Sequence, residues 1–151
     1  MSPTLQEYFE ALNRNNQDSI IHFRIFPDKA NDIFTGTKLD IPLAQLDSVV
    51  PKLQKHNDQN RCIAAVVNSG GHSDRDITRI NAQFVEMDEG TFEEQQAKID
   101  AFPLPPSIVN QTEKSLHVYW LMDDSAVVKN FRSIQEALVK WFDGDSCCVN
   151  E

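Results

Sequence analysis

The chain has 151 residues, of which 40% are hydrophobic, so it is long enough for one domain with a hydrophobic core. Its 14 basic and 23 acidic residues give a formal net charge of −9, which argues against a protein that coats nucleic acid through bulk positive charge. Its three cysteines show neither a metal-binding spacing nor a disulfide framework. These cysteines, and the lack of a membrane-length apolar run in the sequence, predict a cytoplasmic protein without a membrane partner.

The acidic residues are unevenly distributed along the chain. Residues 82–151 contain 13 of the 23 acids but 5 of the 14 bases, whereas residues 1–81 are nearly neutral. Most of these carboxylates are expected on the solvated surface, which is the usual place for a carboxylate. Any carboxylates with a chemical role are expected in the second half of the chain.

The chain begins with a predicted helix and a predicted strand. Apolar residues at helical spacing predict a helix over residues 5–12. Residues 20–26 alternate along a strand, which places Ile21 on one face and His22 on the other. Residues 27–40 are rich in Asp, Lys and Gly and predict a loop.

A second helix and a second strand follow. Residues 43–57 predict a helix in two pieces, with Pro51 at the start of the second piece. Residues 62–67 (CIAAVV) form a continuous apolar run, which predicts a buried central strand.

The second half of the chain predicts three further strands and a capped helix. Strands are expected over residues 82–88, 107–111 and 115–121. Thr91 and Glu94 match a capping box, which predicts that a helix begins between the first two of these strands.

A long helix is predicted after the last strand. Its apolar stripe has spacings of three and four residues and consists of Val127, Phe131, Ile134, Leu138 and Trp141. Asp124 or Ser125 is expected to cap its N-terminus. The mixed order of helices and strands predicts an α/β or α+β domain, with a sheet covered by helices on one or both faces.

Two acidic residues, Glu86 and Asp88, stand at the end of an apolar strand. Because side chains alternate along a strand, both point to the same face, about 7 Å apart at Cα. This separation suits one or two hard divalent cations that are held by carboxylate oxygens. The alternative is a strand end that runs into solvent, where acidic residues are common.

Ser115 and His117 share one face of the strand over residues 115–121. A hydroxyl and an imidazole side by side can each donate a hydrogen bond to a phosphate. A nucleophile and base is a weaker interpretation, because no nucleophile-elbow glycines flank Ser115. A purely structural histidine on a strand is the remaining alternative.

Two further segments carry candidate residues. Asp143-Gly144-Asp145 predicts a turn with the glycine at positive φ, and its functional interpretation is a third carboxylate beside Glu86 and Asp88. The loop over residues 68–79 has a glycine pair that allows close backbone approach to a ligand. Its side chains that suit phosphate are His72, Arg75 and Arg79.

The order of these motifs is more specific than any one of them. A strand ending in acid-x-acid, a helix, a strand opening with Ser-x-His, a long helix and a further Asp resemble the archaeo-eukaryotic primase-polymerase superfamily. Within it, the chain is most similar to the RepB-type and phage or plasmid branch. The resemblance covers roughly residues 20–151 and is carried by VNSGGHSDRDITRINAQFVEMD, PPSIVNQTEKSLHVYWLM and FDGDSCCVNE.

The resemblance implies an RRM-like primase-polymerase core of α/β (α+β) class, with a mixed central sheet and flanking helices. It implies a DNA primase or polymerase that transfers nucleotides with the help of two Mg²⁺ or Mn²⁺ ions. Glu86, Asp88 and Asp145 would be the catalytic carboxylates and the metal ligands, and Asp143 would be the weaker candidate for the third position.

The resemblance also implies nucleotide-binding residues and partners. Ser115 and His117 would bind the triphosphate of the incoming nucleotide, and Lys114 and Arg75 are further candidates for nucleotide binding. The implied partners are nucleoside triphosphates, a DNA template and a helicase domain elsewhere in the full-length protein.

Two features depart from the family pattern. Glu86 occupies a first-motif position that usually holds Asp, and its longer side chain would shift a bound ion. The Arg near a Pro-Gly that usually follows the third motif is not in this sequence. We therefore expect residues 1–151 to be a single domain from the N-terminal part of a longer replication protein.

Two other hypotheses follow from these features. One is a catalytically inactive relative that binds a nucleotide or a partner. The other is an acidic interaction protein that mimics DNA, which the net charge of −9 would suit. A DNA mimic predicts carboxylates spread over one outer face, whereas the first two hypotheses predict that Glu86, Asp88 and Asp145 converge.

Overall fold

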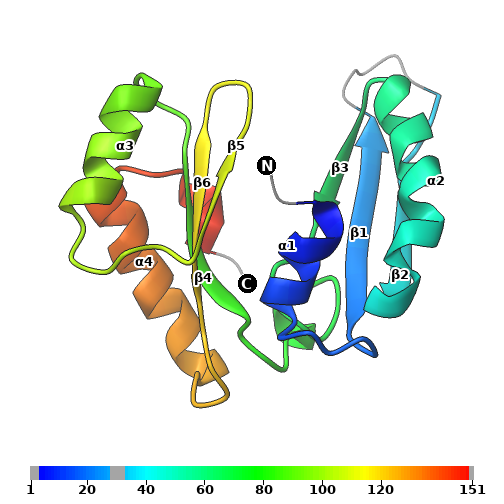
Figure 1. The fold of residues 1–151 in the computed structure, drawn as a ribbon, viewed down its shortest axis with the longest axis horizontal. Helices are drawn as coiled ribbons and strands as arrows, with labels where there is room; N and C mark the ends of the chain where they lie inside the picture. The colour runs from blue at the N-terminus through cyan, green and yellow to red at the C-terminus, as the bar shows by residue number, and fades with distance from the viewer. Residues whose placement is uncertain (1–3, 28–32, 150–151) are drawn as a thin grey trace. The chain divides into compact units, whose positions relative to one another are not determined.

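The computed structural model describes residues 4–27 and 33–149 (Figure 1). The chain divides into two compact units, Met1–His72 and Ser73–Glu151. Each unit contains a three-stranded sheet whose strand pairs are antiparallel. The predicted α+β class is confirmed, and the strands form these two antiparallel sheets in place of one mixed sheet. No helix in the described ranges combines the length and apolar character that a membrane crossing needs.

The first unit is built around β1 (Ile20–Pro27), which lies between β2 (Thr37–Pro42) and β3 (Arg61–Ala65). The predicted alternation of β1 is confirmed, because Ile21 is buried while His22 on the opposite face is half-buried. Helix α1 (Leu5–Leu12) covers the buried face, where the rings of Phe9 and Phe23 meet edge to face at 5.5 Å. The predicted helix over residues 5–12 is confirmed.

Two predictions for this sheet were wrong. Residues 37–40 belong to β2 and not to a loop, since β2 pairs with β1 through six successive partners, from Ile25↔Thr37 to Ile20↔Pro42. Residues 28–32 of the predicted loop lie outside the described residues. The apolar run after residue 61 forms β3 at a sheet edge and is only half-buried, because it has a neighbouring strand on one side.

The predicted two-piece helix has its junction in another place. A 3₁₀ turn, η1 (Leu43–Gln45), is followed by α2 (Leu46–Asp58), so Pro51 lies inside the second piece. Leu46 and Leu53 are seven residues apart and both are buried, which shows that α2 presents one continuous face to the core. This packing outweighs the hydrogen bond that Pro51 cannot donate.

The second unit is built around β6 (Leu116–Leu121), which lies between β4 (Ala82–Met87) and β5 (Ile108–Gln111). All three strands were predicted from the sequence to within two residues. One face of this sheet packs against two helices in a core that consists of Val85, Met87, Ile99, Leu116, Val118, Trp120, Leu138 and Phe142.

Helix α3 (Phe92–Ala101) begins as predicted. The Thr91 side chain accepts a hydrogen bond from the backbone of Glu94, and the Glu94 side chain accepts one from the backbone of Thr91. This reciprocal capping box fixes where the chain turns after β4.

Helix α4 (Phe131–Phe142) is shorter than predicted, and its buried face agrees with the predicted stripe only in part. Its N-cap is Asn130, because residues 128–130 form the 3₁₀ turn η3 (Val128–Asn130), and neither Asp124 nor Ser125 caps it. Of the predicted stripe, three side chains are exposed: Val127, Ile134 and Trp141. The buried face contains Phe131, Gln135, Leu138 and Phe142. The predicted stripe and the buried face share Phe131 and Leu138, and the two differ because a glutamine occupies a core position.

The turn after α4 also differs from the prediction. Asp143, and not Gly144, has the positive φ of 54° and ends the helix in the left-handed region. Gly144 is required for a different reason. A Cβ atom on it would lie 2.4 Å from Val85 Cγ2 and 3.0 Å from the Glu86 carbonyl oxygen. The segment before η4 (Ser146–Val149) therefore lies directly against β4.

Candidate functional site

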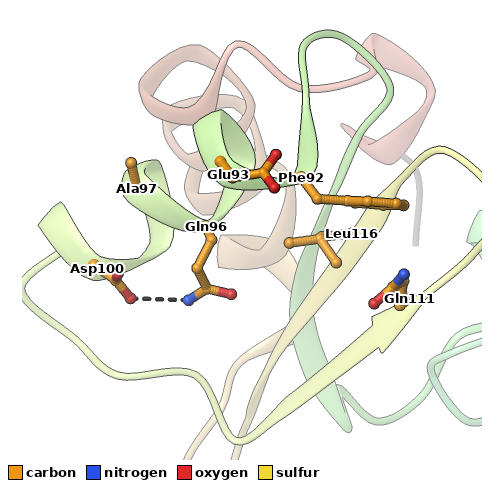
Figure 2. A pocket seen from close by; sticks show the side chains of 7 residues that line it. All are labelled: Phe92, Glu93, Gln96, Ala97, Asp100, Gln111 and Leu116. Atoms are coloured by element: carbon orange, nitrogen blue, oxygen red, sulfur yellow. Dashed lines mark hydrogen bonds between the residues drawn. The ribbon is translucent and has the colours of Figure 1, made fainter.

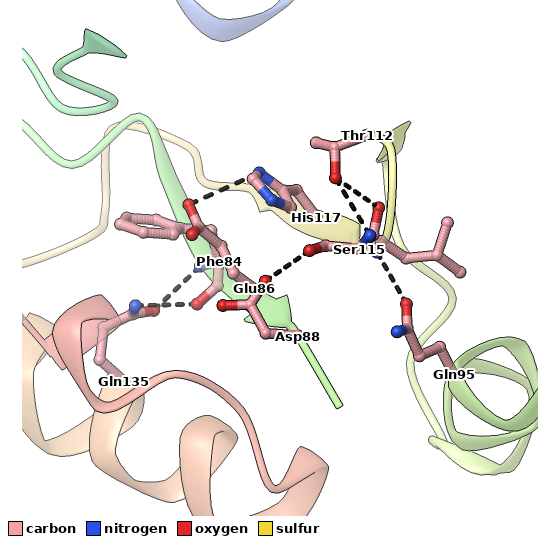
Figure 3. A network of polar contacts seen from close by, with 9 residues as sticks. Phe84, Glu86, Asp88, Gln95, Thr112, Ser115, His117 and Gln135 are labelled. Atoms are coloured by element: carbon pink, nitrogen blue, oxygen red, sulfur yellow. Dashed lines mark hydrogen bonds and ion pairs between the residues drawn. The ribbon is translucent and has the colours of Figure 1, made fainter. Parts of the chain in front are cut away.

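Four of the predicted site residues lie together at one end of β4 and β6 (Figure 3). Glu86 is directly opposite His117 in the strand register, and His117 Nδ1 lies 3.5 Å from Glu86 Oε1. The Ser115 hydroxyl donates a hydrogen bond to the Asp88 carboxylate. The register therefore brings each member of the acid-x-acid motif beside one member of the Ser-x-His motif.

The burial of these side chains differs in a way that matters for binding. Ser115 is 2% exposed, whereas Asp88 is exposed to solvent. The side chains of His117 and Glu86 are 23% and 35% exposed. The hydroxyl and the imidazole are thus held in fixed, partly sheltered positions, while the carboxylates remain open to an ion from solution.

Asp145 reaches the same region through its backbone. Its N–H donates a 2.9 Å hydrogen bond to the Glu86 carbonyl oxygen, and its carboxylate accepts one of 2.8 Å from the N–H of Cys147. The carboxylates of Asp145 and Glu86 both act on the thiols of Cys147 and Cys148. A hydrogen bond to Asp145 and the nearby charge of Glu86 raise the pKa of the Cys147 thiol. Burial, reinforced by the charge of Glu86, raises the pKa of the Cys148 thiol to about 12. The third predicted acid therefore lies beside the end of β4 that carries the first two.

Gln135 on α4 holds this arrangement together, and sequence patterns did not identify it. Its buried amide accepts a 2.9 Å hydrogen bond from the Phe84 N–H and donates one of 2.8 Å to the Phe84 carbonyl oxygen (Figure 3). The same amide donates to the carbonyl oxygen of Cys148. Since β4 is an edge strand, this side chain satisfies backbone groups that another strand would otherwise pair. Its only signal in the sequence is its helical spacing from the buried apolar residues Phe131, Leu138 and Phe142.

Gln95 on α3 has the corresponding role on the other side of the site. Its amide oxygen accepts a 2.8 Å hydrogen bond from the Leu116 N–H, and its amide nitrogen lies 3.1 Å from the Lys114 carbonyl oxygen. The same nitrogen reaches the carbonyl oxygens of Glu89 and Gly90 at 3.3 Å. The buried Gln95 thus fixes the loop after Asp88 to the start of β6.

The side chains of the remaining predicted residues, Lys114, Arg75 and Asp143, form no hydrogen bond or ion pair with the three predicted acids in the described part of the chain. Lys114 is exposed and directly precedes Ser115, and Arg75 is exposed in the 3₁₀ turn η2 (Asp74–Asp76). In the described ranges, no hydrogen bond or ion pair joins either cationic side chain to Glu86, Asp88 or Asp145. Asp143, the weaker candidate for the third acid, is the exposed C-cap of α4.

The donor set of this site fits hard divalent cations. Glu86, Asp88 and Asp145 offer carboxylate oxygens, which are the ligands preferred by Mg²⁺ and Mn²⁺. Within the described residues, these three carboxylates do not form a group whose ligand atoms all lie within 4.8 Å of one another. The described residues contain one such group, which consists of His22, Asp40 and His72 in the first unit.

A shallow pocket of about 450 Å³ lies elsewhere on the second unit, between α3 and the sheet (Figure 2). Its lining comprises Phe92, Glu93, Gln96, Ala97, Asp100, Gln111 and Leu116. Leu116 points to the opposite face of β6 from His117, so this pocket is separate from the carboxylate site. It contains none of the predicted catalytic or nucleotide-binding residues.

Comparison with known proteins identifies the fold. Neither a protein-family model nor a curated protein sequence matches the chain. Among solved structures, the AEP domain of the cyanophage S-2L primase-polymerase matches with a TM-score of 0.76 and 25% identity, over 95% of this chain and 74% of that one.

Two structures of the primase RepB′ match as well. One has a TM-score of 0.63 and 12% identity over 93% of this chain, which spans 46% of that protein. The other, the catalytic domain in complex with initiator DNA, has a TM-score of 0.62 and 12% identity, over 93% of this chain and 70% of that one. The chain therefore has the fold of the archaeo-eukaryotic primase-polymerase superfamily, and the predicted similarity to its phage and RepB-type members is confirmed at the level of the fold.

Proposed function

We propose that this chain is a metal-dependent nucleotidyltransferase domain of the primase-polymerase type, which joins nucleoside triphosphates on a DNA template. The observation that supports this proposal most directly is the pairing of the two motifs across β4 and β6. Glu86 faces His117 and Asp88 faces Ser115, with Asp145 bound to the backbone of Glu86. The residues that we propose to bind metal and those that we propose to bind phosphate are thus neighbours where β4 ends and β6 begins.

Glu86, Asp88 and Asp145 would hold the Mg²⁺ or Mn²⁺ ions. When bound, the ions would favour attack by a 3′-oxygen and stabilise the departing pyrophosphate. The protein contributes position: β4 carries Glu86, Asp88 follows the last residue of β4 and accepts a hydrogen bond from Ser115, and the Asp145 backbone bond to Glu86 fixes the third acid. Such placement matters because a displacement of about 1 Å can lower a rate roughly 10²-fold.

Ser115 and His117 would bind the triphosphate. Their donors now face the carboxylates of Asp88 and Glu86, and phosphate oxygens are acceptors of the same kind. On nucleotide binding, the hydroxyl and the imidazole exchange carboxylate partners for phosphate partners. Thr112 keeps Ser115 in place, because its hydroxyl lies 3.0 Å from the Ser115 N–H and 3.2 Å from the Ser115 carbonyl oxygen.

Lys114 and Arg75 are proposed as further cations for the nucleotide. Both are exposed and carry charge that phosphate would attract. The DNA template is supported by the solved complex of the RepB′ catalytic domain with initiator DNA, which has the same fold.

Melting temperature, followed with Mn²⁺ plus a deoxynucleoside triphosphate, tests the proposal. A ligand that binds only the folded state raises stability by mass action. We expect stabilisation of the wild-type protein that Asp88→Ala abolishes, together with a loss of primer extension of at least about 10²-fold. Glu89→Ala is the matched control, since it removes an exposed acid from the same loop.

Each outcome has a clear meaning. Stabilisation without primer extension in the wild-type protein would identify a catalytically inactive, nucleotide-binding relative. No stabilisation in either protein would contradict the proposal and favour the acidic interaction protein. Equal losses in Asp88→Ala and Glu89→Ala would show that general charge, and not the carboxylate at position 88, governs binding.

A further inference from the structure

A second cluster of potential ligands lies in the first unit, and the proposed nucleotidyl transfer does not use it. His22 on β1, Asp40 on β2 and His72 after β3 bring one ligand atom each to within 4.8 Å of the others. His22 Nδ1 lies 2.8 Å and His72 Nε2 lies 2.5 Å from the same Asp40 oxygen, Oδ1. We name these three residues the His22–Asp40–His72 cluster.

Strand pairing builds two sides of this cluster. His22 and Asp40 are direct partners in the antiparallel register of β1 and β2. Ile21 and Phe23 are buried on the opposite face of β1, so the hydrophobic core fixes the direction in which His22 points. Turning His22 to the other face of the sheet would require a change in the packing of the whole strand.

The loop after β3 supplies the third side. The Val66 N–H donates a 2.9 Å hydrogen bond to the His22 carbonyl oxygen, which extends the pairing of β3 with β1 and directs the chain along this strand. The rings of His72 and His22 then lie 4.9 Å apart between centroids, at an interplanar angle of 67°. The cluster thus joins residues from positions 22, 40 and 72 through backbone contacts that lie within one unit.

The burial of the cluster is unusual for a surface hydrogen-bond group. The side chains of His22 and His72 are 13% and 11% exposed, whereas that of Asp40 is 53% exposed. His72 Nδ1 is buried, and no atom in the described part of the chain forms a hydrogen bond with it. The other ring nitrogen, Nε2, faces Asp40 and is the atom available to an ion held between the three side chains. The exposed carboxylate leaves a route by which an ion could enter.

The chemistry of the donors selects a class of ion. Two imidazole nitrogens and one carboxylate oxygen suit Zn²⁺ and neighbouring first-row divalent ions, whereas Mg²⁺ prefers an all-oxygen set. Ligand atoms around a tetrahedral ion with bonds of about 2.0 Å stand roughly 3.3 Å apart. The observed separations of 2.8 and 2.5 Å would therefore need to open by less than about 1 Å.

We propose that the His22–Asp40–His72 cluster is a binding site for one Zn²⁺ ion. Three protein ligands leave a fourth position for water or for a ligand atom from another molecule. The site shares no residue with the carboxylate site on β4 and β6, and it differs from that site in its donor atoms. The alternative is a hydrogen-bonded group in which Asp40 serves only as the acceptor for two imidazoles.

Zinc retention by the full chain separates these two possibilities. Purified protein is stripped with a chelator, incubated with Zn²⁺ and desalted, and the zinc content is measured by atomic spectroscopy. We expect about one equivalent for the wild-type protein, because three ligands complete one site. His72→Ala and Asp40→Asn should each lower the affinity for Zn²⁺ by at least roughly 10- to 100-fold, which is the loss that removal of an outer-shell partner causes.

His56→Ala is the matched control. His56 belongs to the same unit but contacts Arg61 and the ring of Phe34 instead of the cluster. The His56→Ala variant should retain the full zinc content, as should the variants Asp145→Asn and Cys147→Ser in the second unit. Co²⁺ provides a second measurement, since its visible spectrum should report imidazole coordination in the wild-type protein and in these three controls.

Three results would overturn the proposal. The first is a wild-type protein that retains no zinc. The second is zinc that His72→Ala and Asp40→Asn both retain at wild-type affinity. The third is zinc that disappears in Cys147→Ser or Asp145→Asn, which would assign it to the second unit. Asp40→Asn preserves side-chain size, so its circular dichroism and melting curve show whether a loss of zinc occurs in a folded protein.

Discussion

The two sheets of this protein use the same device to place a histidine beside a carboxylate. In each, the acid lies on an edge strand and the histidine lies directly opposite on the central strand: Asp40 and His22 in the first unit, Glu86 and His117 in the second. In each, a further group comes from outside the sheet, which is His72 in the first unit and Asp145 in the second. Antiparallel strand pairing therefore explains why each acid lies beside a histidine. The group that comes from outside the sheet distinguishes the two sites.

The difference between the added groups determines the chemistry we expect. His72 makes the first cluster rich in nitrogen, which favours Zn²⁺, whereas Asp88 and Asp145 make the second rich in oxygen, which favours Mg²⁺ or Mn²⁺. Two sites with the same strand geometry can thus differ in metal preference. For this reason we expect Mg²⁺ to bind weakly at the first cluster, and Zn²⁺ not to be the preferred ion at the second site.

A change at Gln135 should affect the second unit most strongly. Gln135→Leu would remove the partners of the Phe84 N–H and carbonyl groups and of the Cys148 carbonyl group. Because each of the three unsatisfied buried groups costs about 1–3 kcal/mol, we expect the free energy of unfolding to fall by at least about 3 kcal/mol in urea titrations.

The control for this change lies in the first unit. Gln54→Leu removes an exposed hydrogen bond of 2.8 Å to Asp58, and it should change stability by less than about 0.5 kcal/mol. Gln135→Leu should also weaken nucleotide binding while zinc retention persists. Equal effects of both variants on stability would show that Gln135 does not support β4 as described.

A smaller effect is expected at Gly144. A methyl group in Gly144→Ala would meet Val85 Cγ2 at 2.4 Å and the Glu86 carbonyl oxygen at 3.0 Å. Val85 is fully buried and cannot move aside, so the segment carrying Asp145 should shift away from β4. We expect a loss of about 1–3 kcal/mol in stability, measured by urea unfolding, and weaker Mn²⁺-dependent nucleotide binding. Ser146→Ala, at an exposed neighbouring position, should change neither quantity, and wild-type behaviour of Gly144→Ala would contradict this contact.

The smallest effect is expected for Asp40→Asn in the first unit, and it concerns how the free energy of unfolding changes at acid pH. The hydrogen bond from His22, with a further one from His72, lowers the pKa of Asp40 below its ordinary value of 3.8. A lowered pKa contributes stability above the ordinary value, and this contribution disappears as the pH falls through the pKa of the folded state. The difference in unfolding free energy between wild type and Asp40→Asn should therefore narrow below about pH 4. A difference that stays constant from pH 6 to pH 2 would show that ionised Asp40 is not stabilised by the histidines.

The sequence was sufficient for the elements whose signals are local. The capping box at Thr91 and Glu94 placed the start of α3, and alternation placed β1, β4 and β6. Because strand alternation fixes side-chain direction, it also predicted that Glu86 shares a face with Asp88. The collinear motifs then predicted the primase-polymerase fold, which the solved structures confirm.

Features that depend on distant partners were missed. Strand β2 has no strong apolar pattern and forms because β1 provides its hydrogen bonds. Gln135 was overlooked because its three partners, on β4 and after α4, are set by tertiary structure. Asp40 and His72 lie 32 residues apart, so only the folded first unit brings them together. The roles of the predicted catalytic and nucleotide-binding residues remain predictions that the Asp88→Ala experiment tests.

The buried face of β4 and β6 has a consequence for errors in folding. Val85 pairs with Val118 and Met87 pairs with Leu116 on the core side, one residue away from the Glu86 and His117 pair. A slip of one residue would move Val85 and Met87 out of this core and turn Glu86 into it, because strand faces alternate. A molecule with the misaligned register would thus be less stable than the native one. The same aliphatic contacts that stabilise the sheet therefore also favour the register in which Glu86 lies opposite His117.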